Sequence, residues 1–192
     1  MNEARQTVER DLEILEVMVA EMDGYLMSEA THWTMERGDM PKLTIGGCLM
    51  RCHRLPLVRD HLDEEAQQRL DKAVQTFTQA LAENVVRFEK RIHQELHARL
   101  ADWSGYLAHA ASRMMADVDY FANVVDARVV IQAMVDELHK PAYQFDKRIL
   151  QEMTTLDNNL KGRWQIGEFV WPTVWKPAYP PETYWWLYGR PK

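Results

Sequence analysis

Cysteine is scarce in this sequence, and long apolar runs are missing from it. The 192 residues include only two cysteines, Cys48 and Cys52. On one helix they would be neighbours poorly placed for a disulfide, so we expect a reducing compartment, the cytoplasm. No stretch approaches the roughly 20 apolar residues that span a bilayer. The charged N-terminus lacks the apolar core of a signal peptide, and no membrane association is expected.

An excess of positive charge is also absent. The formal net charge is −6, with 27% charged residues. Proteins that bind nucleic acids gather Lys and Arg against the phosphates, so no nucleic-acid partner is expected. The hydrophobic fraction of 46% is that of an ordinary globular chain and not of a disordered one. The length suits one domain, with room for an appendage.

Helix breakers are nearly absent from the middle of the chain. Between Pro56 and Pro141 there is no proline, and Gly105 is the only glycine. Such a segment favours long helices, because interior Pro costs roughly 3 kcal/mol and Gly roughly 1 kcal/mol. No stretch shows sustained alternation with a period of two, so no sheet is expected.

The apolar spacing predicts an all-α fold: a helical bundle of four major helices and one short helix over residues 1–162. On the first helix an apolar seam alternates steps of four and three, at Val8, Leu12, Leu15, Val19, Met22 and Leu26. The helical signal fades between Asp117 and Val125. The helices are expected at about Glu3–Arg37, 45–54 (the short one, capped by Thr44), 63–114 (capped by Asp63) with a bend at Ser104-Gly105, 126–139, and 146–160.

Residues 163–192 form a second segment, an extended tail rich in Trp and Pro. Nine aromatic residues are interleaved there with five prolines, a composition that excludes a helix. In one interpretation the tail packs on its own bundle, the usual fate of so much apolar surface. In the other, Tyr184, Trp185, Trp186 and Tyr188 dock on a second subunit or another partner, because Trp and Tyr dominate interface anchors.

His93 and His97 are the best candidates for metal ligands. They lie four residues apart on one predicted helix, and Glu89 lies one turn earlier on the same strip. A catalytic metal would need at least one more ligand from another helix. The alternative to a metal site is that this strip is simply the solvated edge of a long helix. No cofactor is expected. A metal-dependent enzyme or sensor is the second functional hypothesis.

The segment from Thr44 to Arg54 is a further candidate site. Gly46 and Gly47 could present backbone N–H groups at a helix start, and Arg51 and Arg54 add positive charge, which together suit a small anionic ligand. The alternative is ordinary packing, with the arginines paired to neighbouring carboxylates. Nucleophile and nucleotide motifs such as Gly-x-Ser-x-Gly and Gly-x-Gly-x-x-Gly are missing.

The sequence favours a non-catalytic protein that works through protein–protein contacts. The apolar seam of the first helix and the aromatic tail both suggest contact surfaces. We therefore expect a homo-oligomer, a homodimer in the simplest case, or a complex with another protein. Whether the protein is an enzyme stays open.

Overall fold

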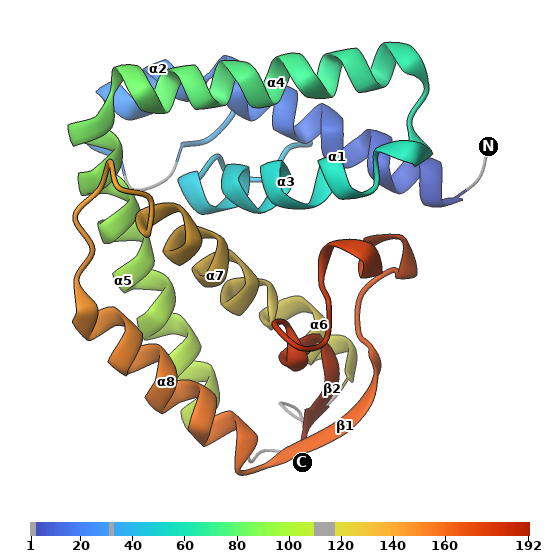
Figure 1. Cartoon of the computed structure of the whole chain (residues 1–192), viewed down its shortest axis with the longest axis vertical. Helices are drawn as coiled ribbons and strands as arrows, with labels where there is room; N and C mark the ends of the chain where they lie inside the picture. Colours follow the sequence, from blue (N-terminus) through green and yellow to red (C-terminus); the bar gives the residue numbers. More distant parts are fainter. Residues whose placement is uncertain (1–2, 31–32, 110–117) are drawn as a thin grey trace. The chain divides into compact units, whose positions relative to one another are not determined.

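The protein is mostly helical, as predicted (Figure 1). The structure, a computed structural model, describes residues 3–30, 33–109 and 118–192, with Val118 and Asp119 described by their backbone alone. Eight α-helices lie within these ranges. The chain divides into two compact units, Met1–Glu95 (unit 1) and Leu96–Lys192 (unit 2). The division predicted at residue 162 stays a prediction.

Unit 1 is built around α1, which packs against α3 and α4 (Figure 1). The apolar seam predicted on the first helix forms the core, and each of its side chains is at most 7% exposed. Burial of an aliphatic side chain of this size stabilises a fold by roughly 1.5–3 kcal/mol. The elements are α1 (Glu3–Ala20), α2 (Met22–Met27), α3 (Ile45–Leu57), the 3-10 turn η1 (Arg59–His61), α4 (Glu64–Glu83) and the first part of α5 (Val85–His109).

The first helix is shorter than predicted. The expected Glu3–Arg37 helix is divided at Glu21 into α1 and α2, and α2 ends at Met27. Ser28 accounts for this end, because its hydroxyl donates a hydrogen bond to the Tyr25 carbonyl oxygen at 2.9 Å. Side-chain bonds of this kind compete with helical backbone bonds. Residues 31–32 of the predicted helix lie outside the described residues.

The chain after α2 is held to unit 1 by polar contacts. Glu21 accepts hydrogen bonds from the Trp33 indole Nε1–H at 2.7 Å and from the Glu36 backbone N–H at 3.2 Å. Trp33 and Leu43 exchange two backbone hydrogen bonds of 3.1 and 2.8 Å. These contacts between distant residues stabilise an irregular conformation where local propensity predicts a helix.

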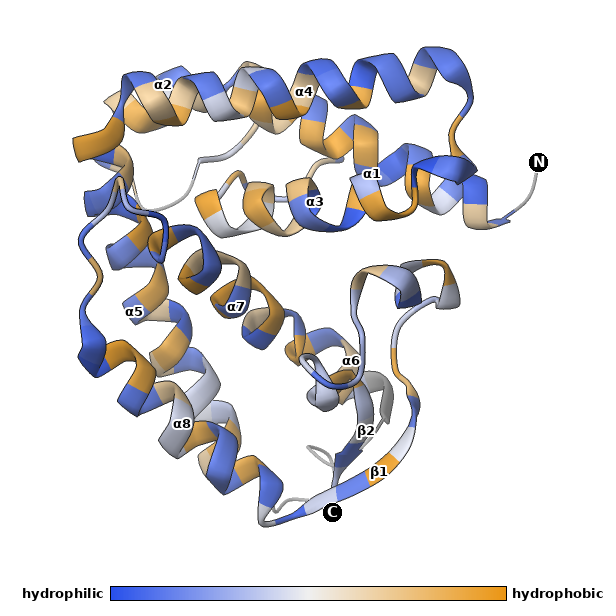
Figure 2. Ribbon diagram, in the orientation of Figure 1, coloured by the Kyte–Doolittle hydropathy of each residue, from blue (hydrophilic) through white to orange (hydrophobic). Residues whose placement is uncertain are grey.

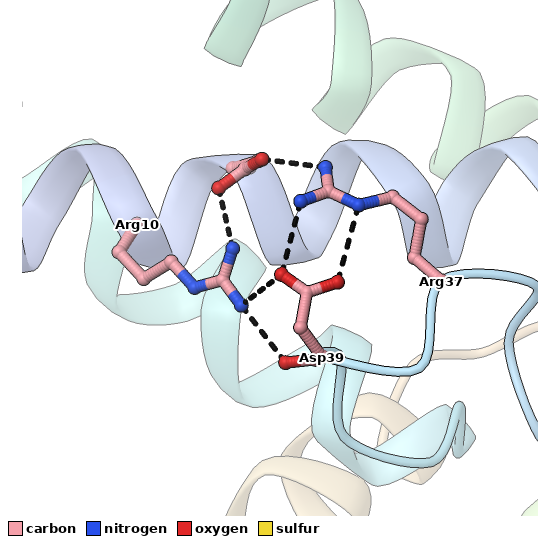
Figure 3. Close-up of polar contacts among 4 residues, drawn as sticks. Arg10, Arg37 and Asp39 are labelled. Atoms are coloured by element: carbon pink, nitrogen blue, oxygen red, sulfur yellow. Dashed lines mark hydrogen bonds and ion pairs between the residues drawn. The ribbon is translucent and has the colours of Figure 1, made fainter.

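Two arginines and two carboxylates join this irregular segment to α1 (Figure 3). Arg10 pairs with Glu13 at 2.6 Å and with Asp39 at 2.9 Å. Arg37 pairs with the same two carboxylates, at 2.5 Å and 3.0 Å. The pKa of Glu13 is lowered, most strongly by Arg37, and the pKa of Asp39 is lowered, most strongly by Arg10.

The long helix predicted over 63–114 is divided at Asn84 into α4 and α5. The Asn84 side chain donates from Nδ2 to the Ala80 carbonyl oxygen at 3.1 Å. Asn favours such local bonds over helix continuation, and Val85 and Val86 after it are weak helix formers. Figure 2 shows polar and apolar residues alternating around α4, as expected for a helix with one buried face.

Ser104 and Gly105 both lie within α5, which runs to His109, so the helix continues through them as expected, and the bend stays a prediction. The remainder of that prediction, up to Met114, falls outside the described residues. The predicted loss of helix between Asp117 and Val125 is wrong, since α6 (Val118–Val124) occupies that segment.

Three helix starts agree with the sequence. The side chains of Thr44, Asp63 and Asp146 each accept a hydrogen bond from a backbone N–H two or three residues later, at 2.9–3.0 Å. These N-caps begin α3, α4 and α8 and satisfy donors that have no partner within the helix. α3 runs to Leu57, slightly past the predicted end, with Pro56 in its last turn.

Unit 2 contains three further helices and a small sheet. The expectation that the chain forms no sheet is therefore wrong. The elements after α5 are α6 (Val118–Val124), α7 (Asp126–Leu138), α8 (Lys147–Lys161), β1 (Trp164–Phe169), the 3-10 turns η2 (Thr173–Ala178) and η3 (Trp185–Leu187), and β2 (Tyr188–Pro191). β1 and β2 are antiparallel, with Gln165 opposite Arg190 and an irregularity between Ile166 and Phe169. β1 is mostly exposed to solvent, and the four residues of β2 include Gly and Pro. Neither strand therefore shows the sustained apolar–polar alternation that identifies a strand in a sequence.

Two glycines are expected to respond oppositely to substitution. Gly105→Ala should stabilise the protein by up to about 1 kcal/mol, because glycine is unfavourable within a helix and a Cβ there meets nothing within 4 Å in the described part of the chain. Gly189→Ala should destabilise it, because Gly189 has a φ of +147° and a Cβ would clash with the Gln165 carbonyl oxygen. Urea unfolding followed by circular dichroism measures both. A destabilised Gly105→Ala variant would contradict the prediction.

The ion-pair cluster of Figure 3 predicts a loss of stability in acid. Because Glu13 and Asp39 have lowered pKa values in the folded state, their contribution is present above their unfolded pKa values near 4 and is lost as the pH falls through the folded values. Urea midpoints of wild type and Arg37→Gln should therefore differ at pH 7 and converge towards pH 2. The difference should also shrink in high salt. A difference independent of pH would exclude this contribution.

Candidate functional site

Asp11 lies at the centre of a buried ion-pair cluster between α1 and α3. Its carboxylate accepts from Arg51 Nε at 3.0 Å, from Arg54 Nε at 2.8 Å and from Arg54 Nη2 at 2.6 Å. All three side chains are buried. Burying a charge is costly unless it is paired and hydrogen-bonded, and here both guanidinium groups share one carboxylate.

The glycines of the predicted anion site also bond within the chain. The Gly46 N–H donates to Glu95 Oε2 at 3.1 Å, and the Gly47 carbonyl oxygen accepts from Arg51 Nη1 at 3.0 Å. Together with the Gly47 N–H, which donates to Thr44 Oγ1, these contacts correspond to the packing alternative. The anion-binding hypothesis for this segment stays a prediction and gains no support from them.

The two cysteines of α3 are free thiols. Cys48 is buried, and burial raises the pKa of its thiol well above the ordinary value. A protonated thiol is a poor nucleophile and a poor metal ligand. Cys48 therefore contributes to the core as a small apolar residue.

The three residues of the predicted metal site all lie on α5, Glu89 and His93 in unit 1 and His97 in unit 2. His93 Nδ1 lies 2.8 Å from the Glu89 backbone oxygen, one turn back in the helix. Within residues 3–30, 33–109 and 118–192, no three His, Cys, Asp or Glu side chains gather as metal ligands. The metal-site hypothesis stays a prediction that lacks a third ligand among these residues.

The aromatic tail packs within unit 2, on Arg128 of α7. The Arg128 guanidinium lies 3.8 Å from the centre of the Trp186 ring. On α8, the Asp157 carboxylate accepts from Nε and Nη2 of the same arginine, both at 2.9 Å. Arg128 is 3% exposed. A bidentate ion pair and a cation–π contact thus join α7, α8 and the tail at one side chain.

Two of the four predicted interface anchors face inward. Tyr184 and Trp186 are buried, whereas Trp185 and Tyr188 are half-buried. Burial raises the pKa of Tyr184 to about 12. Successive ring contacts of 4.9–5.7 Å connect the rings of the tail, from Trp164 through Trp185, Trp186, Tyr184 and Tyr179 to Trp171. These ring contacts agree with the interpretation in which the tail packs on its own chain.

Unit 2 also contains a cavity of about 570 Å³ bordered by α5, α6 and the start of α7. Trp103, Tyr106 and Tyr120 supply aromatic surface, and Arg99 and Asp102 supply charge. Burial raises the pKa of Tyr106 to about 12. Such a mixture of aromatic and polar groups is common in small-molecule sites. The sequence analysis missed this cavity because its residues are dispersed over three helices.

The exposed face of the hairpin formed by β1 and β2 is a second feature that the sequence analysis missed. Ile166 on β1 is 86% exposed, the highest value among the large apolar side chains described as exposed. A hollow of about 390 Å³ borders it, lined by residues 165–170 of β1 and the chain after it, with Gly189 and Arg190 of β2. Figure 2 shows apolar segments between polar ones along β1.

No protein-family model, curated protein or solved structure compared with this chain matches it. Among the helices of the described residues, none is both long and apolar enough to cross a membrane.

Removal of the Asp11 charge is expected to destabilise unit 1 strongly. Asp11→Asn leaves Arg51 and Arg54 buried without a counter-charge, and breaking a buried ion pair in this way costs about 3–5 kcal/mol. Glu3→Gln is the matched control on the same helix, because Glu3 is exposed to solvent and its change should alter stability little. Urea unfolding of the two variants tests this, and equal midpoints would contradict the assigned role of Asp11.

Proposed function

We propose that this protein acts through non-catalytic contact with a second copy of itself, and that the exposed face of the β1–β2 hairpin forms the contact. The observation that carries the proposal is the exposed Ile166, beside a hollow in the same small sheet. Such a surface favours contact over catalysis, because it combines apolar area with unsatisfied strand edges.

Strand pairing leaves an edge of β1 available. The sheet has two strands among the described residues, and β2 covers one edge of β1. The other edge carries backbone N–H and C=O groups that can pair with another strand. A two-stranded hairpin alone is marginally stable in water. Pairing of β1 with β1 of a second copy would produce a four-stranded sheet.

The hairpin surface is suited to a symmetric contact with its own copy. A two-fold interface uses the same patch on both subunits, so the patch must be self-complementary. Here one patch contains both the projecting Ile166 and a hollow that could receive the Ile166 of the second copy. If β1 paired with itself about an axis between Ile166 and Gly167, Gln165 would stand opposite Glu168 of the second copy, a carboxamide that donates to a carboxylate.

Charge supports the same arrangement. Arg190 lies opposite Gln165 in the hairpin. Glu168 of the second copy would stand next to Gln165 on the other side, one strand away from the positive charge of Arg190. Rim charges of this kind add specificity more than affinity. The patch is small, and small interfaces belong to weak, transient association. We therefore expect a dimer with a dissociation constant on the order of micromolar or weaker.

Ile166→Lys is expected to weaken the dimer at least tenfold, because it places a charge at the centre of the contact. Sedimentation equilibrium over a concentration series gives the dissociation constant. Val86→Lys is the matched control, since Val86 is 82% exposed and lies on α5 in unit 1. It should leave the constant unchanged.

Two results would overturn the proposal. A wild-type protein that stays monomeric up to millimolar concentration would exclude self-association as the function. A dimer weakened equally by Ile166→Lys and Val86→Lys would place the contact elsewhere.

A further inference from the structure

A small basic pocket lies in unit 1, lined by the end of α2 with the residues after it and by the first turns of α5. Its volume is about 170 Å³. Since a water molecule occupies about 30 Å³ in the liquid, the pocket has room for one tetrahedral oxyanion and a few waters. It is distinct from the Thr44–Arg54 segment, the anion site suggested by the sequence.

Positive charge converges on this pocket in an acidic protein. Arg87, Lys90 and Arg91 line it from one face of α5, where residues three and four apart are neighbours. Glu29 is the acidic residue in the lining, and its carboxylate lies 4.0 Å from Lys90 Nζ. Both side chains of that pair are solvent-exposed, and with three positive residues against one negative residue the lining keeps a formal charge of +2.

Arg91 is held in place at the pocket wall. It is 6% exposed, and its guanidinium lies 4.7 Å from the centre of the Tyr25 ring. It donates to the Ala30 carbonyl oxygen through Nη1 and to Ser28 Oγ at 3.4 Å through Nη2. A guanidinium has five N–H donors in a fixed planar arrangement, so these contacts fix its orientation and leave donors for a ligand.

Two other polar side chains in the lining lack partners among the described residues. Arg87 and Gln94 form no hydrogen bond or ion pair within the described part of the chain. Arg87 supplies a second guanidinium, and Gln94 supplies an amide that can donate from its nitrogen. The pocket therefore combines one fixed arginine with available donors on the same helix face.

We infer that this pocket binds a small soluble oxyanion of the phosphate class. Arginine pairs well with phosphate oxygens, because its planar donors match two of them at once. Two arginines and a lysine suit a doubly charged anion better than a single carboxylate. The inference is independent of the proposed dimer contact, which lies in unit 2.

Arg87→Gln tests the inference without disturbing the core, because Arg87 is exposed and its side chain forms no hydrogen bond or ion pair with the residues that the structure describes. Isothermal titration calorimetry with inorganic phosphate at pH 8 and constant ionic strength gives the dissociation constant. The variant should weaken binding at least fivefold. Lys72→Gln is the matched control: it removes the same charge from an exposed position of α4 in unit 1 and should change binding less than twofold.

Three outcomes would overturn the inference. Equal weakening by the two variants would mean a general charge effect and no site. Chloride competing as well as sulfate at equal ionic strength would mean that the pocket does not recognise a doubly charged oxyanion. Binding to vesicles of anionic phospholipid, with no binding of inorganic phosphate, would assign the basic face to a membrane surface.

Discussion

The burial of arginine is the constraint on which both units depend. Arg51, Arg54, Arg91 and Arg128 are each at most 9% exposed, and a guanidinium cannot escape its charge by losing a proton. Each must therefore meet carboxylates, carbonyl oxygens or ring faces inside the protein. Asp11 provides this in the core of unit 1, and Asp157 with Trp186 provides it in unit 2. These ion pairs join α1 to α3 in unit 1 and α7 to α8 in unit 2.

The sequence predicted well those features that depend on neighbours in the chain. The N-caps at Thr44 and Asp63 were predicted because a cap is recognised within four residues. The positions of α7 and α8 followed from apolar spacing. The end of α2, the break at Asn84 and the β1–β2 sheet were missed. The first two each involve one local side chain, Ser28 and Asn84, which gives only a weak signal in a sequence. The sheet depends on a distant contact, Gln165 with Arg190.

The candidate sites show the same limit. Arg51 and Arg54 were recognised as unusual, but their partner Asp11 is some forty positions away in the chain. One signal was present: Asp11 falls three residues after Val8 and four before Leu15, on the buried seam, where an acidic residue needs a positive partner. Arg87, Lys90, Arg91 and Gln94 show helical spacing in the sequence. Only the fold of the chain after α2 turns that stripe into a pocket.

Arg128 also has a consequence for biosynthesis. Its carboxylate partner is translated 29 residues later, and Trp186 emerges from the ribosome later still. Until then the nascent α7 carries a cation that has no place in an apolar core, so unit 2 cannot close while those residues are still being made. Unit 1 depends on residues up to Glu95 and can fold first. A growing chain therefore carries unfinished C-terminal helices after the N-terminal unit is complete.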